Sequence, residues 1–78
     1  MALRLEDLAD LPVQTIVADR SSLQLIFRKT GAGKTSWETL IPGPGSQFRV
    51  SDRTPPGARS FVALTSALAR GEKLYVLK

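Results

Sequence analysis

The sequence predicts an α+β domain, in which a small antiparallel sheet of four or five strands packs against one helix in the C-terminal half of the chain. Short segments rich in β-branched and aromatic residues alternate with glycine- and proline-rich turns. Residues 58–70 instead show helical periodicity. With 78 residues, we expect a single domain, 1–78, which opens with a short acidic segment at residues 1–11.

The N-terminal segment places leucines among acidic residues and predicts at most two helical turns. Leu5 and Leu8 are three residues apart, and Pro12 ends any helix that precedes it. Such a short helix is stable only when it packs against the rest of the domain. We expect Glu6 and Asp10 to lie on its solvated face.

Three strands are expected next, at residues 13–18, 23–29 and 35–41, with a turn at residues 19–22. A three-residue loop, 31–33, with one glycine in the left-handed conformation would join the second and third strands. Phe27 then lies directly opposite Trp37, Leu25 opposite Thr39, and Leu23 opposite Ile41. A slip of one residue would bury the wrong face, so we expect Phe27 and Trp37 to be neighbours in the core.

The C-terminal half adds a strand at 47–51, a helix at 58–70 and a last strand at 73–77, separated by Pro/Gly-rich breaks. Gly71 stands where a helix C-cap is expected. The alternative is that residues 60–66 form a strand, which would give a small six-stranded barrel. The predicted core consists of Val13 or Ile16, Leu23, Leu25, Phe27, Trp37, Ile41, Phe48, Val50, Phe61, Leu64, Leu68, Leu74 and Val76.

Charge is distributed unevenly along the chain. The net charge is +4, yet residues 1–19 contain one basic and four acidic residues, whereas residues 20–78 contain ten basic and three acidic residues. This split predicts contact with an anionic partner, or association between the acidic head of one copy and the basic body of another.

The composition points away from catalysis. Histidine and cysteine are both absent, which removes the usual zinc ligands and thiol nucleophiles. The acidic residues Glu6, Asp7 and Asp10 would form at best a weak site for a hard cation. We therefore expect no enzyme activity, no catalytic residues, no metal site and no cofactor.

The functional expectation is a small protein-binding or assembly module, with nucleic-acid binding through a basic β-hairpin as the alternative. The candidate partner-binding residues are Arg28, Lys29, Lys34, Arg49 and Arg53. The partner would be another protein, a second copy of the chain or a nucleic acid, and not a membrane, since no apolar run approaches the ~20 residues that a membrane-spanning helix needs. The cytoplasm, or a virion assembled there, is the expected location. The absence of Asn, His and Cys is compatible with a GC-rich bacterial or phage gene.

A first prediction concerns the segment TGAGKTS at residues 30–36. It resembles the end of a phosphate-binding loop, but Arg28 occupies the position of the first glycine, and a strand follows where a helix is required. We expect no magnesium-dependent binding of ATP or GTP in a calorimetric titration. Micromolar binding that disappears in Lys34→Ala would contradict this expectation.

Overall fold

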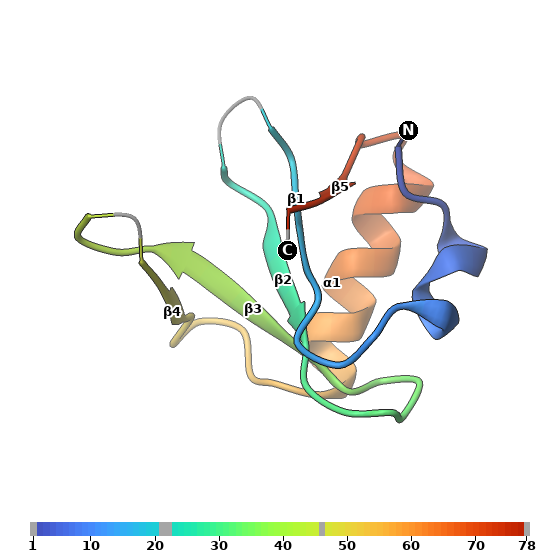
Figure 1. Cartoon of the computed structure of the whole chain (residues 1–78), viewed down its shortest axis with the longest axis horizontal. Coiled ribbons are helices and arrows are strands. Elements are labelled where there is room, and N and C mark those ends of the chain that lie inside the picture. The colour runs from blue at the N-terminus through green and yellow to red at the C-terminus, as the bar shows by residue number, and fades with distance from the viewer. Residues whose placement is uncertain (1, 21–22, 46, 78) are drawn as a thin grey trace.

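A computed structural model describes residues 2–20, 23–45 and 47–77. A 3-10 helix η1 (Leu5–Asp10) precedes the strands β1 (Ile16–Ala18), β2 (Ile26–Lys29), β3 (Trp37–Pro42) and β4 (Phe48–Val50). Helix α1 (Ala58–Ala69) and strand β5 (Tyr75–Val76) complete the chain. The strands form one antiparallel sheet in the order β4-β3-β2-β1-β5, and α1 and η1 lie on the same side of it (Figure 1).

The predicted α+β architecture is confirmed, and the six-stranded barrel is wrong because residues 58–69 are helical. Every strand is shorter at one end or both than the sequence suggested. The predicted turn at residues 19–22 lies partly outside the described residues. Among the described residues, no helix is long and apolar enough to cross a membrane.

The register of the β2–β3 hairpin differs from the predicted one by two residues. Phe27 lies opposite Thr39, and Lys29 lies opposite Trp37. Direct pairing of Phe27 with Trp37 is therefore wrong, but both side chains remain on one face and are 1% exposed. A shift of two residues returns every side chain to its original face, so the hydrophobic pattern cannot distinguish the two registers.

The hairpin loop spans residues 30–36 and is longer than the three residues expected, with the Thr30 amide donating to the carbonyl of Ser36 at 2.8 Å. Neither Gly31 nor Gly33 has a positive φ, so the expected left-handed glycine is absent from this loop. Gly33 instead lies close to the side chain of Ser36, whose hydroxyl can rotate away. A Cβ atom there would lie 2.7 Å from Ser36 Oγ.

The main core lies between the sheet, α1 and η1. Phe27, Trp37, Leu64 and Leu74 are buried there, as predicted. Three predicted core valines are exposed instead, at 45% for Val13, 41% for Val50 and 47% for Val76. Val13 belongs to the turn before β1, and the other two lie on short edge strands, which have a neighbour on one side only. Buried residues that the sequence analysis missed are Leu8, Val17, Ala18, Ile26, Leu40 and Ala67.

Helix α1 covers the N-terminal half of β3. Ser60 is fully buried at this contact, where its hydroxyl lies 2.9 Å from Thr39 Oγ1 and donates to the carbonyl of Pro55. The amide of Gly57 donates to the carbonyl of Trp37, which attaches the start of the helix to the start of β3. Gly71, at φ 91°, follows the end of the helix as predicted.

The turn before β1 generates a stability prediction. The amide of Thr15 donates to the carbonyl of Pro12, and Gln14, the third residue of this turn, has φ 77°. A positive φ at this position favours glycine. Gln14→Gly should therefore raise the free energy of unfolding by up to about 1 kcal/mol, measured by urea denaturation.

Gln24→Gly is the matched control, because Gln24 is also exposed but has no positive φ. That change should lower stability, since glycine adds conformational freedom to the unfolded chain. Equal effects of the two substitutions would contradict the interpretation of the turn.

Candidate functional site

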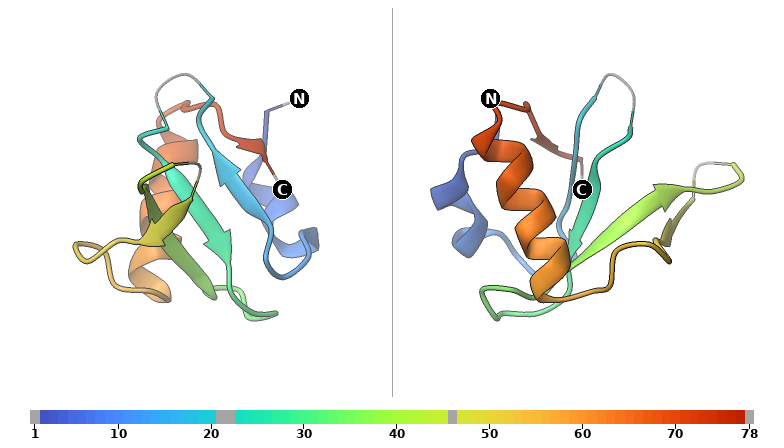
Figure 2. Two further views of the ribbon diagram at one scale, coloured as in Figure 1. Left: turned by 60° about the vertical axis from the view of Figure 1, so that its left-hand side comes forward. Right: turned by 180° about the vertical axis from the view of Figure 1, so that it is seen from behind.

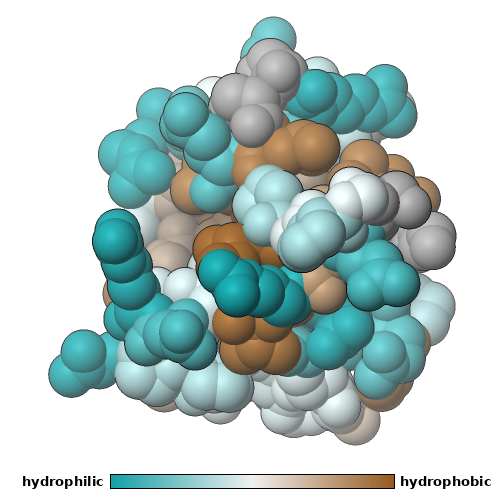
Figure 3. All heavy atoms as spheres, turned by 90° about the vertical axis from the view of Figure 1, so that its left-hand side faces the viewer, coloured by the Kyte–Doolittle hydropathy of each residue, from teal (hydrophilic) through white to brown (hydrophobic). Residues whose placement is uncertain are grey.

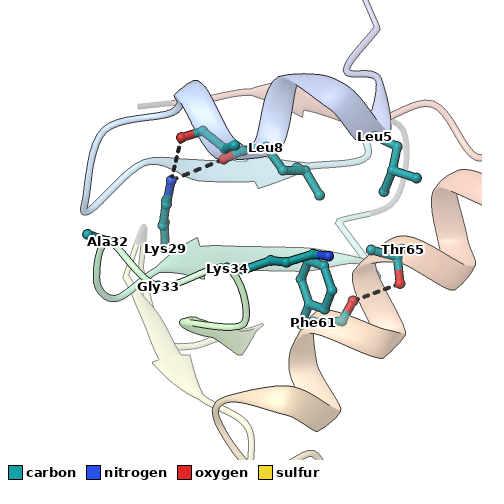
Figure 4. A pocket seen from close by; sticks show the side chains of 9 residues that line it. Leu5, Leu8, Lys29, Ala32, Gly33, Lys34, Phe61 and Thr65 are labelled. Atoms are coloured by element: carbon teal, nitrogen blue, oxygen red, sulfur yellow. Dashed lines mark hydrogen bonds between the residues drawn. The ribbon is translucent and has the colours of Figure 1, made fainter.

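A groove with a volume of about 530 Å³ lies between η1, the 30–36 loop and α1 (Figure 4). We call it the η1–α1 groove. Helix η1 contributes Leu5, Leu8 and Ala9, the loop contributes Ala32, Gly33 and Lys34, and α1 contributes Phe61 and Thr65. Lys29, at the end of β2, completes the lining. Three segments that are distant in sequence therefore meet at one concave and mainly apolar surface.

Lys29 ties two walls of the groove together. Its Nζ donates to the carbonyls of Leu8 and Ala9 at 3.1 and 3.3 Å (Figure 4), and to the carbonyl of Leu11 at 2.8 Å. These carbonyls stand at or just beyond the end of η1 and carry partial negative charge, and the carbonyl of Leu8 also accepts from the amide of Leu11 at 3.4 Å. An ammonium group has three N–H donors, so this geometry uses all of them. The residue is 4% exposed, and its ammonium group is hydrogen-bonded within the protein.

Of the two lysines that line the groove, Lys34 is the exposed one. It is exposed in the 30–36 loop, and its side chain extends toward Phe61 and Thr65 (Figure 4). The hydroxyl of Thr65 already donates to the carbonyl of Phe61 at 3.0 Å. Below this polar rim, Phe61 provides apolar surface above the buried Leu8, and Leu5 stands 59% exposed at the edge.

The groove combines apolar side chains with two lysines. No carboxylate lines the groove among the described residues, and the two lysines differ, because only Lys34 is free to meet a ligand. The described part of the chain holds no group of three residues able to ligate a metal ion. An apolar surface with one well-placed charge is the usual composition of a ligand-binding cleft.

The five predicted partner-binding residues do not form one basic tip. Lys34 lines the groove, and Arg28 lies on the opposite face of the sheet, where its Nε donates to Glu38 Oε2 at 2.8 Å. Arg49 is exposed on the edge strand β4, and Arg53 is exposed in the connection between β4 and α1.

The expectation that Lys29 is a surface residue is wrong. Side chains alternate along β2, so Lys29 shares the inward face with Leu25 and Phe27. Its position opposite Trp37 directs the ammonium group toward η1. Sequence reasoning also missed Leu5, Leu8 and Phe61 as site residues. The position of Lys29, two residues after Phe27 on the apolar face of the strand, could have indicated that its side chain points inward.

Glu6 and Asp10 are exposed, as expected for the N-terminal helix. Arg4 lies within 3.1 Å of Glu6 and 3.9 Å of Asp7, so part of the acidic charge is balanced locally. No protein-family model matches the chain, and no curated protein or solved structure shows significant similarity to it. The interpretation of the groove therefore depends on its own geometry.

The role of Lys29 gives the prediction of this section. Lys29→Met keeps the length of the apolar stem but removes the donor to three carbonyls, and should lower the free energy of unfolding by about 2–4 kcal/mol. Urea denaturation measures the loss, and hydrogen exchange should show faster exchange of the amides in η1.

Lys34→Met is the control, because Lys34 is exposed and bonds to none of the described residues. Its effect should stay within about 0.5 kcal/mol. If both substitutions destabilise equally, or η1 stays protected in Lys29→Met, the anchoring role of Lys29 is refuted.

Proposed function

We propose that this chain is a small protein-binding module without catalytic activity, and that the η1–α1 groove holds a segment of its partner. The observation that supports this proposal is that one lysine of this apolar groove, Lys29, is buried, while the other, Lys34, is exposed. The ammonium group of Lys29 is hydrogen-bonded to backbone carbonyls, whereas that of Lys34 bonds to none of the described residues and lies at the rim beside exposed apolar surface. Such a site provides apolar contact and one charge, but no acid–base pair.

The partner segment that fits this site carries a large apolar side chain next to a carboxylate. The apolar side chain would lie against Leu5 and Phe61, and the carboxylate would pair with Lys34. The net charge of +4 would speed the approach of an acidic partner. Of the lining residues, Leu5, Ala9, Ala32, Gly33 and Lys34 are exposed. A small molecule needs closer enclosure than this, so a polypeptide segment lying across the groove is the better occupant.

Nucleic-acid binding has weaker support. Trp37 and Phe27 are 1% exposed, so neither side chain is available to stack on a base. Arg28 is paired with Glu38, and Lys29 with the backbone. Arg49 and Arg53 remain exposed but lie on other elements than Lys34. As part of the same proposal, we place the module in the cytoplasm or in a particle assembled there, since it contains no cysteine for disulfides.

Selection from a random peptide library against the full chain tests this proposal. Enriched peptides should combine Leu, Phe or Trp with a neighbouring Asp or Glu. Lys34→Glu should weaken the best peptide at least tenfold, since it places like charges together. Lys73→Glu makes the same charge change at an exposed position outside the groove and should have little effect.

Fluorescent DNA and RNA oligonucleotides provide the opposing measurement. Weak binding that disappears at moderate salt is expected from net charge alone. Tight binding to an oligonucleotide, with peptides bound no better by the wild type than by Lys34→Glu, would refute the proposed function in favour of the alternative.

A further inference from the structure

The sheet carries apolar side chains on both faces, whereas α1 and η1 cover only one. On the other face lie Ile16, Ala18, Ile26, Leu40, Phe48 and Val50, which we call the open face. In the left view of Figure 2 the strands stand in front of α1, with no helix before them. Figure 3 views this side and shows apolar atoms at its centre, surrounded by polar ones.

The open face carries more apolar residues than a solvent-exposed sheet face usually does. Antiparallel sheets with one solvated face usually carry polar residues there. Ala18, Ile26 and Leu40 are at most 2% exposed and are therefore already buried within one copy, so the apolar surface left for a partner is that of the partly buried side chains packed around them, such as Ile16 and Phe48. Val50, opposite Leu40 on the edge strand, is 41% exposed. Apolar surface gathered in one place in this way typically marks an interface.

The charges on the open face indicate what kind of surface would cover it. Arg28 and Glu38 lie directly opposite each other on β2 and β3, with Nε and Oε2 2.8 Å apart. The Glu38 side chain is 10% exposed and that of Arg28 is 33% exposed. A guanidinium has five N–H donors, and Nε accounts for one of them. The other four have no acceptor among the described residues, so this neutral pair still offers donors to a partner.

We propose that the open face packs against the open face of a second copy of this chain, related by a two-fold axis. Among the described residues the cation at the centre of this face is Arg28, which is already paired with Glu38, so an acidic protein or a nucleic acid would meet no unpaired cation there. A copy of the same face brings apolar surface together with a carboxylate that can accept from the terminal nitrogens of Arg28, and the reciprocal contact follows from symmetry. The Arg28–Glu38 pair is thus complementary to itself.

The size of the face sets the expected strength. The side of the molecule seen in Figure 3 measures 23 by 21 Å. A contact confined to this side would bury at most roughly 500 Å² per copy, and the total falls in the range of weak interfaces, below about 1,200 Å². We expect a weak dimer with a dissociation constant in the micromolar range. The η1–α1 groove lies on the covered side of the sheet, so both grooves would remain accessible in the dimer.

Sedimentation equilibrium between about 10 µM and about 1 mM chain tests the proposal. The mean mass should rise from the monomer value of 8.5 kDa toward twice that value. Val50→Lys should weaken the dimer at least about tenfold, because it places a charge in an apolar contact. Val62→Lys is the matched control, since Val62 is 59% exposed on α1, away from the open face. Circular dichroism establishes that both variants fold.

Three results would overturn a dimer formed through the open face. The first is a wild-type mass of 8.5 kDa at the highest concentration. The second is equal weakening of the dimer by Val50→Lys and Val62→Lys. The third is a dimer that Val50→Lys leaves intact but that dissociates in about 0.5 M NaCl. The last result would instead indicate the head-to-body charge contact. Peptide binding in the groove should be unchanged in Val50→Lys, so failure of the dimer and failure of the proposed function are distinguishable.

Discussion

The ammonium group of Lys29 joins the last residue of β2 to the carbonyl end of η1, and much of the rest of the structure depends on this contact. A 3-10 helix of six residues has few internal hydrogen bonds and does not persist alone. Once anchored, it buries Leu8 in the core and sets Leu5 at the rim of the groove. The backbone of Lys29 also bonds Gln14 and Thr15, so the same residue extends the pairing of β1 with β2.

Some basic side chains are bonded within the chain, and another is exposed and available to a partner. Lys29 and, in part, Arg28 are committed to contacts within the chain, whereas Lys34 remains exposed beside apolar surface. The two proposed contact surfaces also lie on opposite sides of one sheet. If the open face pairs with a second copy, the dimer presents two grooves, and a partner with two suitable segments would gain avidity without any further contact. A domain of 78 residues would then carry one contact surface on each side of its sheet.

Local patterns predicted much of the fold. Alternation placed Phe27 and Trp37 on the buried face, and helical periodicity with Gly71 located α1 to within one residue. The register of the hairpin was not predictable in this way, because a two-residue shift leaves each face unchanged. The exposure of Val50 and Val76 was also not predictable, since it follows from strand order, which makes β4 and β5 the two edges of the sheet.

The candidate site shows the same limit on what can be predicted from the sequence. The sequence by itself determined which segments become strands and helix, where charge is available, and that histidine and cysteine chemistry is absent. Only the tertiary structure decided that Lys29 is internal while Lys34 is free. The reason is physical, since alternation assigns a side chain to a face, but the atoms it meets there come from residues distant in the chain. The carbonyls of Leu8, Ala9 and Leu11 become acceptors for Lys29 only after η1 has packed beside β2.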